Sequence, residues 1–483
     1  MKRRERVGNA EEEKWVCHAC VGEAFLKARI KKEGEKHRCS FCRHQRAALP
    51  LDAIVDAFDQ AFERHLYRTS DQPSDYEYLL MKESSYQWDR SGDPVLWVLQ
   101  EVGGIDEKLA EAMRSELCDR HYEHDEFQNE GDFDEDSHYS YSAINTEEFS
   151  AAWKSFTEDL KTRSRYFSRT AEATLNNLFE GIHEYKTNNG REIIVKAGPG
   201  TGFTSLHRAR VFQSSERLEE ALKRPDLEIG PPPPRLATAG RMNAQGIAVF
   251  YGAVDAMVAL AEVRPFVGSR VVIAKFDIVR SLNLLDLEAL KSVEIKGSLF
   301  EPKYGAELEK AKFLGSLSSR LAAPVMPDDE PFEYVPTQAI ADFLATGREP
   351  VIDGIIYPSV QGNKGAKNVV LFHKATKVHE LEIPDGTRIT AQLENMTEDG
   401  PEIDYWVWEE IPKKGKKKKA ATRKAAAHRL DWTPIARLNE DDRELTLKID
   451  VESIQVHHIS GICFETDDFK VKRHRFEERD RKF

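Results

Sequence analysis

The stretch GRMNAQGIAVFYGAVDAMVALAEV, residues 240–263, predicts a turn, a short buried strand and a helix in succession. Residues 248–251 are an apolar run typical of a buried strand. Asp255 is a residue type that caps helix N-termini, and a helical run follows it. Tyr251 therefore stands at a strand end, and Glu262 lies about two turns along the next helix.

Polar side chains stand on or just after other predicted strands. Residues 355–357 predict a strand, and Ser359 follows it after Pro358. Upstream, Arg208 lies in the sequence His207-Arg208-Ala209-Arg210. Sites are commonly built on strand ends and the loops after them, because the sheet fixes their geometry.

The order of Arg208, the Gly-Arg-Met-Asn turn, Tyr251, Glu262 and Ser359 resembles the RES domain, a family named for its Arg, Glu and Ser. The resemblance covers roughly residues 200–375. It implies a mixed α/β sheet like that of ADP-ribosyltransferases. It also implies NAD+ as substrate, since characterised members destroy NAD+ and act as bacterial toxins.

The resemblance gives each of these residues an expected role in an NAD+ pocket. Glu262 is the candidate to stabilise the positive charge that develops on the ribose, as in glycoside hydrolysis. Arg208, helped by Arg241, is expected to bind the diphosphate. Tyr251 is expected to contact the nicotinamide ring, and Ser359 to orient the ribose or the attacking phosphate or water.

Some neighbouring residues leave alternatives open. Arg210 competes with Arg208 for the diphosphate role, and Gln338 is expected to support a strand or turn. Met242 stands where many RES proteins carry Trp, which predicts a softer pocket wall. The polyproline run 231–234 is interpreted as a spacer, with a lid over the site as the alternative.

Two cysteine pairs near the N-terminus predict a structural zinc site. Cys17 and Cys20 form one C-x2-C pair, and Cys39 and Cys42 form the other after eighteen intervening residues. Four thiolates close a tetrahedron around Zn2+ and leave no position for a catalytic water. Three histidines lie close enough in sequence to replace a cysteine: His18, His37 and His44.

Four apolar stripes of helical spacing predict a helical bundle after the cysteine segment. They are Ile54, Phe58, Phe62 and Leu66; Ile105, Leu109, Met113 and Leu117; Phe149, Trp153, Phe156 and Leu160; and Ala171, Leu175, Leu178 and Ile182. Asn145 with Glu148 predicts a capping box before the third helix. This region resembles the HEPN-like domain fused to some RES proteins. Arg114 and His121 fit the Arg-x4–6-His spacing of HEPN ribonucleases, a spacing that is common by chance.

The whole chain is expected to be a multidomain α+β protein of 483 residues with a net charge of −13. The predicted domains are a four-cysteine zinc-binding segment (1–50), a helical HEPN-like domain (51–190), a RES domain (200–375) and a β-containing C-terminal extension (376–483). Gly198–Gly202 is interpreted as a hinge or linker into the RES domain. An acidic stretch (123–136) and a lysine-rich loop (413–424) are interpreted as solvated loops, with weak nucleic-acid attraction through the lysines as an alternative.

The composition excludes a membrane span, since no run of ~20 apolar residues occurs. The N-terminus lacks the apolar core of a secretory signal, so a cytoplasmic location is expected. The leading hypothesis is an NAD+ phosphorylase or glycohydrolase, acting as a toxin or anti-phage effector that its N-terminal domains or a partner antitoxin or trigger protein regulate. The alternatives are an ADP-ribosyltransferase acting on a protein or nucleic acid, and a zinc-organised nucleic-acid-binding or RNA-cleaving module.

Overall fold

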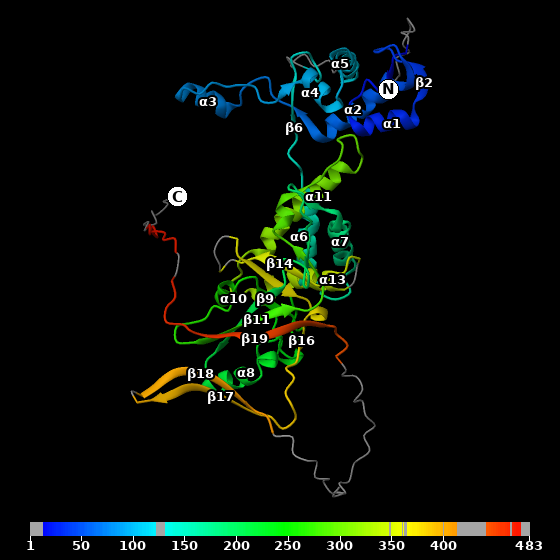
Figure 1. Cartoon of the computed structure of the whole chain (residues 1–483). Helices are drawn as coiled ribbons and strands as arrows, with labels where there is room; N and C mark the ends of the chain where they lie inside the picture. The colour runs from blue at the N-terminus through cyan, green and yellow to red at the C-terminus, as the bar shows by residue number, and fades with distance from the viewer. Residues whose placement is uncertain are drawn as a thin grey trace. The chain divides into compact units, whose positions relative to one another are not determined.

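The computed structural model describes residues 13–121, 131–346, 349–359, 361, 365–398, 400–412, 441–463 and 466–474. The chain divides into two compact units (Figure 1). Unit 1 comprises residues 1–193 with 289–320, and unit 2 comprises 194–288 with 321–483. The lysine-rich loop and much of the acidic stretch lie outside the described residues. In the part of the chain that is described, no helix combines the length and the apolar content that crossing a bilayer requires.

Unit 1 begins with a small antiparallel sheet in the order β1-β3-β2. Its elements are β1 (Trp15–Cys17), α1 (Ala24–Glu33), β2 (Glu35–Arg38) and β3 (Gln45–Pro50). Helix α1 begins at an unusual cap, because the Glu23 carboxylate accepts hydrogen bonds from the backbone N–H groups of Phe25 and Leu26. Buried Leu26 and Ile30 of α1 join the same hydrophobic core as the helices that follow.

The four predicted helical stripes lie on α2 (Leu51–His65), α5 (Glu107–His121), α6 (Glu147–Thr162) and α7 (Arg169–Phe179), although Leu66, Ile105 and Ile182 fall outside these helices. Unit 1 also contains α3 (Asp75–Glu83), α4 (Val95–Gly103) and the part of α11 (Tyr304–Ala322) up to residue 320, which no stripe predicted. Short strands accompany them: β4 (Leu66–Arg68), β5 (Asp93–Pro94), β6 (His138–Tyr141), β7 (Lys186–Thr187) and β13 (Val293–Glu294). Phe58, Leu109 and Met113 from the stripes are fully buried.

The predicted capping box of α6 is wrong. The helix is capped by Thr146 without a side-chain hydrogen bond. Asn145 Oδ1 instead accepts a hydrogen bond from the backbone N–H of Glu147, two residues further along the chain, at 2.8 Å. This local side-chain-to-backbone turn forms in place of the capping box.

Unit 2 contains a nine-stranded mixed sheet in the order β16-β19-β11-β9-β10-β15-β14-β12-β8. Its strands are β8 (Ile194–Ala197), β9 (Ser205–Phe212), β10 (Phe250–Ala253), β11 (Arg270–Ile278), β12 (Leu282–Asp286), β14 (Gly354–Pro358), β15 (Lys367–Leu371), β16 (Lys377–His379) and β19 (Leu445–His458). Pairs β12–β14 and β16–β19 are parallel, and the other pairs are antiparallel. Figure 1 shows β19, near the end of the chain, beside β11.

The helices of unit 2 are α8 (Ser215–Lys223), α9 (Pro225–Glu228), α10 (Ala256–Glu262), α12 (Glu330–Glu333) and α13 (Val335–Ala345). Strand alternation gives the sheet two apolar faces. Phe250 and Phe276 belong to a large core on one face. Ala209 and Ala253 belong to a smaller core on the other, where Ala259 of α10 joins them. Helix α10 therefore lies on the second face and carries Glu262 at its C-terminal end.

The C-terminal region contributes to this sheet and also forms a hairpin. Within the described part of the chain, strands β17 (Arg388–Thr397) and β18 (Gly400–Glu410) pair with each other and with no other strand. Gly198–Gly202 connects β8 with β9, and the Gly198 N–H donates to the Phe203 carbonyl at 2.7 Å. The segment joins two strands of one sheet, so its interpretation as a hinge into the next domain is wrong.

Candidate active site and metal centre

Glu262 ends α10 with one carboxylate oxygen held from two directions. Its Oε1 accepts a hydrogen bond from Ser359 Oγ at 2.5 Å and another from Asn368 Nδ2 at 2.6 Å. Among the described residues, Oε2 has no hydrogen-bond partner. As predicted, Asp255 caps the helix, since its Oδ1 accepts from the N–H groups of Met257 and Val258. The cap determines where α10 begins, and the length of the helix then determines the position of Glu262 at its end.

Asn368 is the residue that sequence reasoning missed. It lies on β15 directly opposite Tyr357 of β14, and only 2% of its surface is exposed. Its Nδ2 donates to Glu262, while its Oδ1 is buried without a hydrogen-bond partner in the described part of the chain. A polar residue opening the apolar run Val369-Val370-Leu371 was the available signal.

Arg208 lies next to this carboxylate pocket, whereas Arg210 does not. Strands β9 and β10 pair at one position, where Ala253 lies opposite His207. Next to this position, Arg208 Nη1 donates a hydrogen bond to the Tyr251 carbonyl at 2.8 Å. Arg208 Nε is buried and has no hydrogen-bond partner among described residues. Burial, followed by the charge of Arg210, lowers the pKa of Arg208 to about 10, so it remains cationic at neutral pH.

Arg210 borders a different cavity of about 670 Å³, together with the polyproline run 231–234. Its guanidinium donates to the Glu228 carbonyl and lies 3.6 Å from the Glu228 carboxylate. Arg210 already has these partners, and the polyproline run does not line the cavity that contains Glu262.

The Gly240–Asn243 turn is held by buried polar groups. Tyr251 Oη accepts from the Met242 N–H at 3.0 Å and donates to Asn243 Oδ1 at 2.9 Å. Gly240 is required here, because a Cβ atom would lie 2.8 Å from Tyr251 Oη. Gln338 Nε2 donates to the Gly240 carbonyl, which confirms its predicted supporting role.

This turn positions Arg241. Its Nη1 donates to the carbonyls of Leu321 and Ala323, at 2.6 and 2.8 Å, just where α11 ends. The guanidinium carbon also lies 5.1 Å from the centroid of the Tyr334 ring, in a cation–π arrangement. Arg241 is thus fixed by its neighbours while it borders the pocket.

The pocket has a volume of about 420 Å³, in the usual range of small-molecule sites. Arg208, Arg241, Tyr251 and Glu262 all line it. Ser359 is not among the lining residues and is connected through its hydrogen bond to Glu262.

Tyr357 lines the pocket together with two other tyrosines, Tyr251 and Tyr334. Burial raises the pKa of Tyr357, and its hydroxyl has no hydrogen-bond partner among the described residues. Met242 is buried and faces a separate cavity with Ile247 and Val249, so the expectation that it softens a wall of the pocket is wrong.

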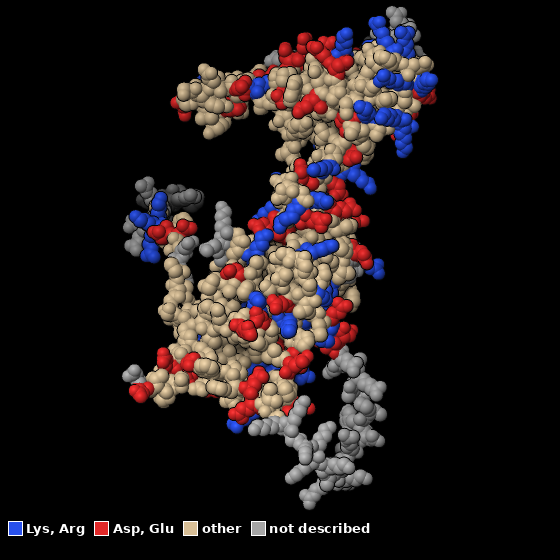
Figure 2. Space-filling view, viewed as in Figure 1, with Lys and Arg blue, Asp and Glu red and all other residues tan. Residues whose placement is uncertain are grey.

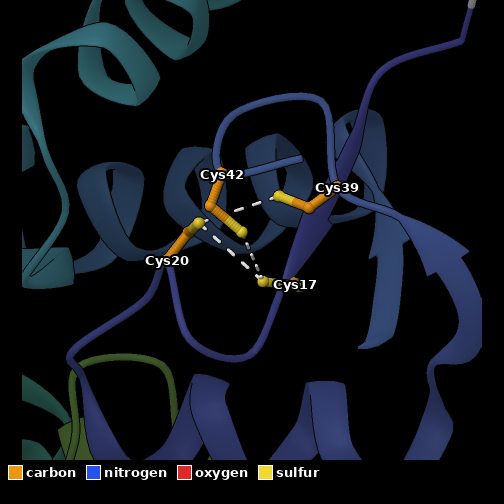
Figure 3. Close-up of side chains that lie close together, drawn as sticks. All are labelled: Cys17, Cys20, Cys39 and Cys42. Atoms are coloured by element: carbon orange, nitrogen blue, oxygen red, sulfur yellow. Dashed lines mark hydrogen bonds between the residues drawn. The ribbon is translucent and has the colours of Figure 1, made fainter. Parts of the chain in front are cut away.

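The four N-terminal cysteines converge into a candidate metal centre (Figure 3). Their Sγ atoms all lie within 4.8 Å of one another, with separations of 3.8, 3.5 and 3.7 Å for the pairs Cys17–Cys20, Cys17–Cys42 and Cys20–Cys39. A tetrahedron with zinc–sulfur bonds of about 2.3 Å has sulfur–sulfur edges of roughly 3.8 Å, so the spacing fits Zn2+.

Backbone groups favour the thiolate form at one of these positions. Burial raises the pKa of Cys39, but hydrogen bonds from the backbone N–H groups of Cys42 and Phe41 outweigh it and lower the pKa to about 7. In the described residues, no histidine joins the cluster. His37 instead stacks on Trp15, with ring centroids 4.1 Å apart.

Arg114 and His121, which fit the spacing of the HEPN ribonuclease motif, both lie on α5 and contact neighbouring segments. Arg114 donates to the Phe133 carbonyl at 3.1 Å, and the His121 ring lies 5.2 Å from the Phe133 ring. His121 Nε2 also lies 2.7 Å from Asp59. These contacts support the interpretation that both residues hold the fold together and that their spacing arose by chance.

Comparison with protein families assigns both regions. Residues 207–394 match the RES domain. The chain contains a RES domain. Residues 32–174 match HEPN/RES N-terminal domain 1, which covers α2 to α6 of unit 1. The RES match includes Arg208, Glu262, Ser359 and Asn368. No curated protein and no solved structure matches the chain.

Proposed function

We propose that the RES domain binds NAD+ and cleaves the bond between nicotinamide and ribose, with phosphate or water as the acceptor. The observation that carries the proposal is the state of Glu262. One of its oxygens is fixed by Ser359 and Asn368, and the other has no hydrogen-bond partner among the described residues and lies at a pocket that two arginines border. A carboxylate held in this way is preorganised for charge that develops beside it.

The chemistry requires little acid catalysis, because the pyridinium leaves as neutral nicotinamide. The demanding species is the cationic, oxocarbenium-like ribose. The free Oε2 of Glu262 can stabilise this cation or accept a hydrogen bond from a ribose hydroxyl. Ser359 and Asn368 then act as positioning residues, since both donate to the opposite oxygen of the same carboxylate.

The arginines fit the diphosphate of a dinucleotide. Arg208 has a buried Nε–H without a partner among the described residues, and an anion at the pocket would provide one. Arg241 uses Nη1 for the carbonyls at the end of α11, and its remaining N–H groups have no partner in the described chain. Guanidinium groups bind phosphate oxygens through paired hydrogen bonds.

We further propose that this activity makes the protein a toxin or anti-phage effector, active in the cytoplasm and restrained by its N-terminal domains or by a partner protein. The RES and HEPN/RES matches support this proposal. The four cysteines would hold a structural Zn2+ that closes all four coordination positions.

The test measures NAD+ loss and nicotinamide release by the full chain, with and without phosphate. Glu262→Gln keeps the shape and one acceptor oxygen but removes the charge, so a loss of at least about 100-fold is expected. Glu330→Gln is the matched control, because Glu330 lines the same pocket, and among the described residues its carboxylate accepts a hydrogen bond from the Tyr334 hydroxyl alone. It should change turnover by less than about tenfold.

The products distinguish the possible reactions. Turnover that requires phosphate identifies a phosphorylase, and turnover without phosphate identifies a glycohydrolase. Transfer of label from NAD+ to a macromolecule identifies an ADP-ribosyltransferase instead. Turnover that is equal in Glu262→Gln and wild type would contradict the role of Glu262. No turnover and no thermal stabilisation by NAD+ would overturn the proposal as a whole.

A further inference from the structure

The cysteine segment is a strongly basic part of an acidic chain. Residues 13–50 contain nine Lys or Arg and four Glu, a formal charge of +5, whereas the whole chain carries −13. Zn2+ with four thiolates would contribute −2 and still leave the segment positive. Figure 2 shows lysine and arginine side chains gathered over this part of unit 1, near the N-terminus.

Three of these cations lie around one point of the small sheet. Helix α1 packs against β3, and the His18 backbone N–H donates to the carbonyl of Ala47, the neighbour of Arg46 on that strand, at 3.2 Å. Lys27 and Lys31 are one helical turn apart on α1, and Arg46 lies on the central strand β3. Among the described residues, none of the three forms an ion pair.

An aromatic pair lies beside these cations. Arg46 is directly opposite His37 in the β2–β3 register, so both side chains project from the same side of the sheet. His37 is exposed and stacks on Trp15 with an interplanar angle of 19°. We refer to Trp15, Lys27, Lys31, His37 and Arg46 as the basic face.

We propose that the basic face binds single-stranded nucleic acid, with its lysines and arginine on the phosphates and His37 stacking on a base. Unpaired cations on a surface attract a phosphodiester backbone by releasing its counterions. A rigid aromatic platform next to them is the second feature of single-strand binding sites. The cysteine cluster fixes the loop after β1 and the loop after β2, so the face is preorganised.

This inference is independent of the proposed NAD+ reaction, because its residues all lie in unit 1 and the RES pocket lies in unit 2. It also differs from the lysine-rich loop at 413–424, which lies outside the described residues. The occupant favoured here is nucleic acid and not an acidic protein, because a stacked aromatic pair accompanies the charges.

The experiment measures fluorescence anisotropy of a labelled 20-mer of uridine, and of a 20-mer of thymidine, with the zinc-loaded full chain. Three phosphate contacts predict that log K falls with log salt with a slope of about −2, which weakens binding roughly 20-fold between 50 and 200 mM salt. The triple variant Lys27→Gln, Lys31→Gln, Arg46→Gln should bind at least about tenfold more weakly at 50 mM salt, with a slope near zero.

The matched control removes the same charge elsewhere in unit 1. Lys154→Gln, Arg165→Gln, Lys312→Gln neutralises three exposed cations that form no ion pair with described residues. It should leave binding within about twofold. His37→Ala tests the stacking contact and should weaken binding by about fivefold or more without changing the salt slope. Zinc content and melting temperature show that each variant is folded.

Three results would overturn the proposal. The first is that neither oligonucleotide binds at 50 mM salt, and the second is that the two triple variants lose affinity equally. The third is that binding survives in the basic-face variant and is lost when Lys416–Lys419 are replaced. Preference between the two oligonucleotides distinguishes RNA from DNA as the source of the strand.

Discussion

Tyr251→Phe separates two possible roles of this side chain. The substitution keeps the ring at the pocket wall and removes the hydroxyl that links Met242 N–H with Asn243 Oδ1. Met242 and Asn243 are 2% and 3% exposed, so neither group reaches bulk water. Each of these two buried groups costs about 1–3 kcal/mol when left without a partner, so unit 2 should lose roughly 2–6 kcal/mol of unfolding free energy.

The assay is thermal or denaturant unfolding together with NAD+ turnover. A loss of this size corresponds to a melting temperature lower by roughly 5–25 °C in a domain of this length. Since the turn carries Arg241, the KM for NAD+ should rise while kcat falls little. Tyr357→Phe is the matched control, because the phenol of this half-buried residue has no hydrogen-bond partner among described residues. It should change stability by less than about 1 kcal/mol.

The opposite pattern would refute this reasoning. If Tyr251→Phe melts like the wild type and loses kcat, the hydroxyl acts in the reaction and does not hold the turn. If Tyr357→Phe is the less stable of the two variants, the hydrogen-bond assignment of the pocket is wrong.

Three further predictions follow from contacts described above. Asn368→Leu removes one hydrogen-bond donor to the Glu262 carboxylate, an interaction worth about 1.5–3 kcal/mol. The kcat should therefore fall roughly 10- to 100-fold with little change in KM. An unchanged kcat would mean that Ser359 alone positions Glu262. Lys367→Met removes the ion pair that Lys367 forms with the 1%-exposed Asp286 and should cost roughly 3 kcal/mol in denaturant unfolding, much of it restored by adding Asp286→Asn. The purified chain should contain about one equivalent of zinc, and chelation should unfold the cysteine segment while unit 2 melts unchanged. Because protons compete for the thiolates, zinc affinity should fall as the pH is lowered.

Local patterns made the strand–turn–helix around residues 240–263 predictable. The apolar run predicted β10, and Asp255 predicted the start of α10, because strand alternation and capping act within a few residues. The convergence of the four cysteines was also predictable, since each C-x2-C pair brings two thiolates together on its own turn.

Contacts between distant segments could not be predicted from the sequence. Asn368 and Glu262 are 106 residues apart in the sequence and contact each other because β15 pairs with both β10 and β14. The choice between Arg208 and Arg210 depends on the short pairing of β9 with β10, which no local pattern encodes. The role of β19 as a neighbour of β11 was missed for the same reason.

The interruption of unit 2 by residues 289–320 sets an order of events during synthesis. Ribosomes add residues from the N-terminus, so every segment of unit 1 has been made once residue 320 emerges. Ser359 and Asn368, which fix Glu262, are still to come at that moment. At about 5–20 residues per second, the following ~50 residues take roughly 2–10 seconds. A nascent chain therefore has the whole of unit 1 before its carboxylate pocket can be completed.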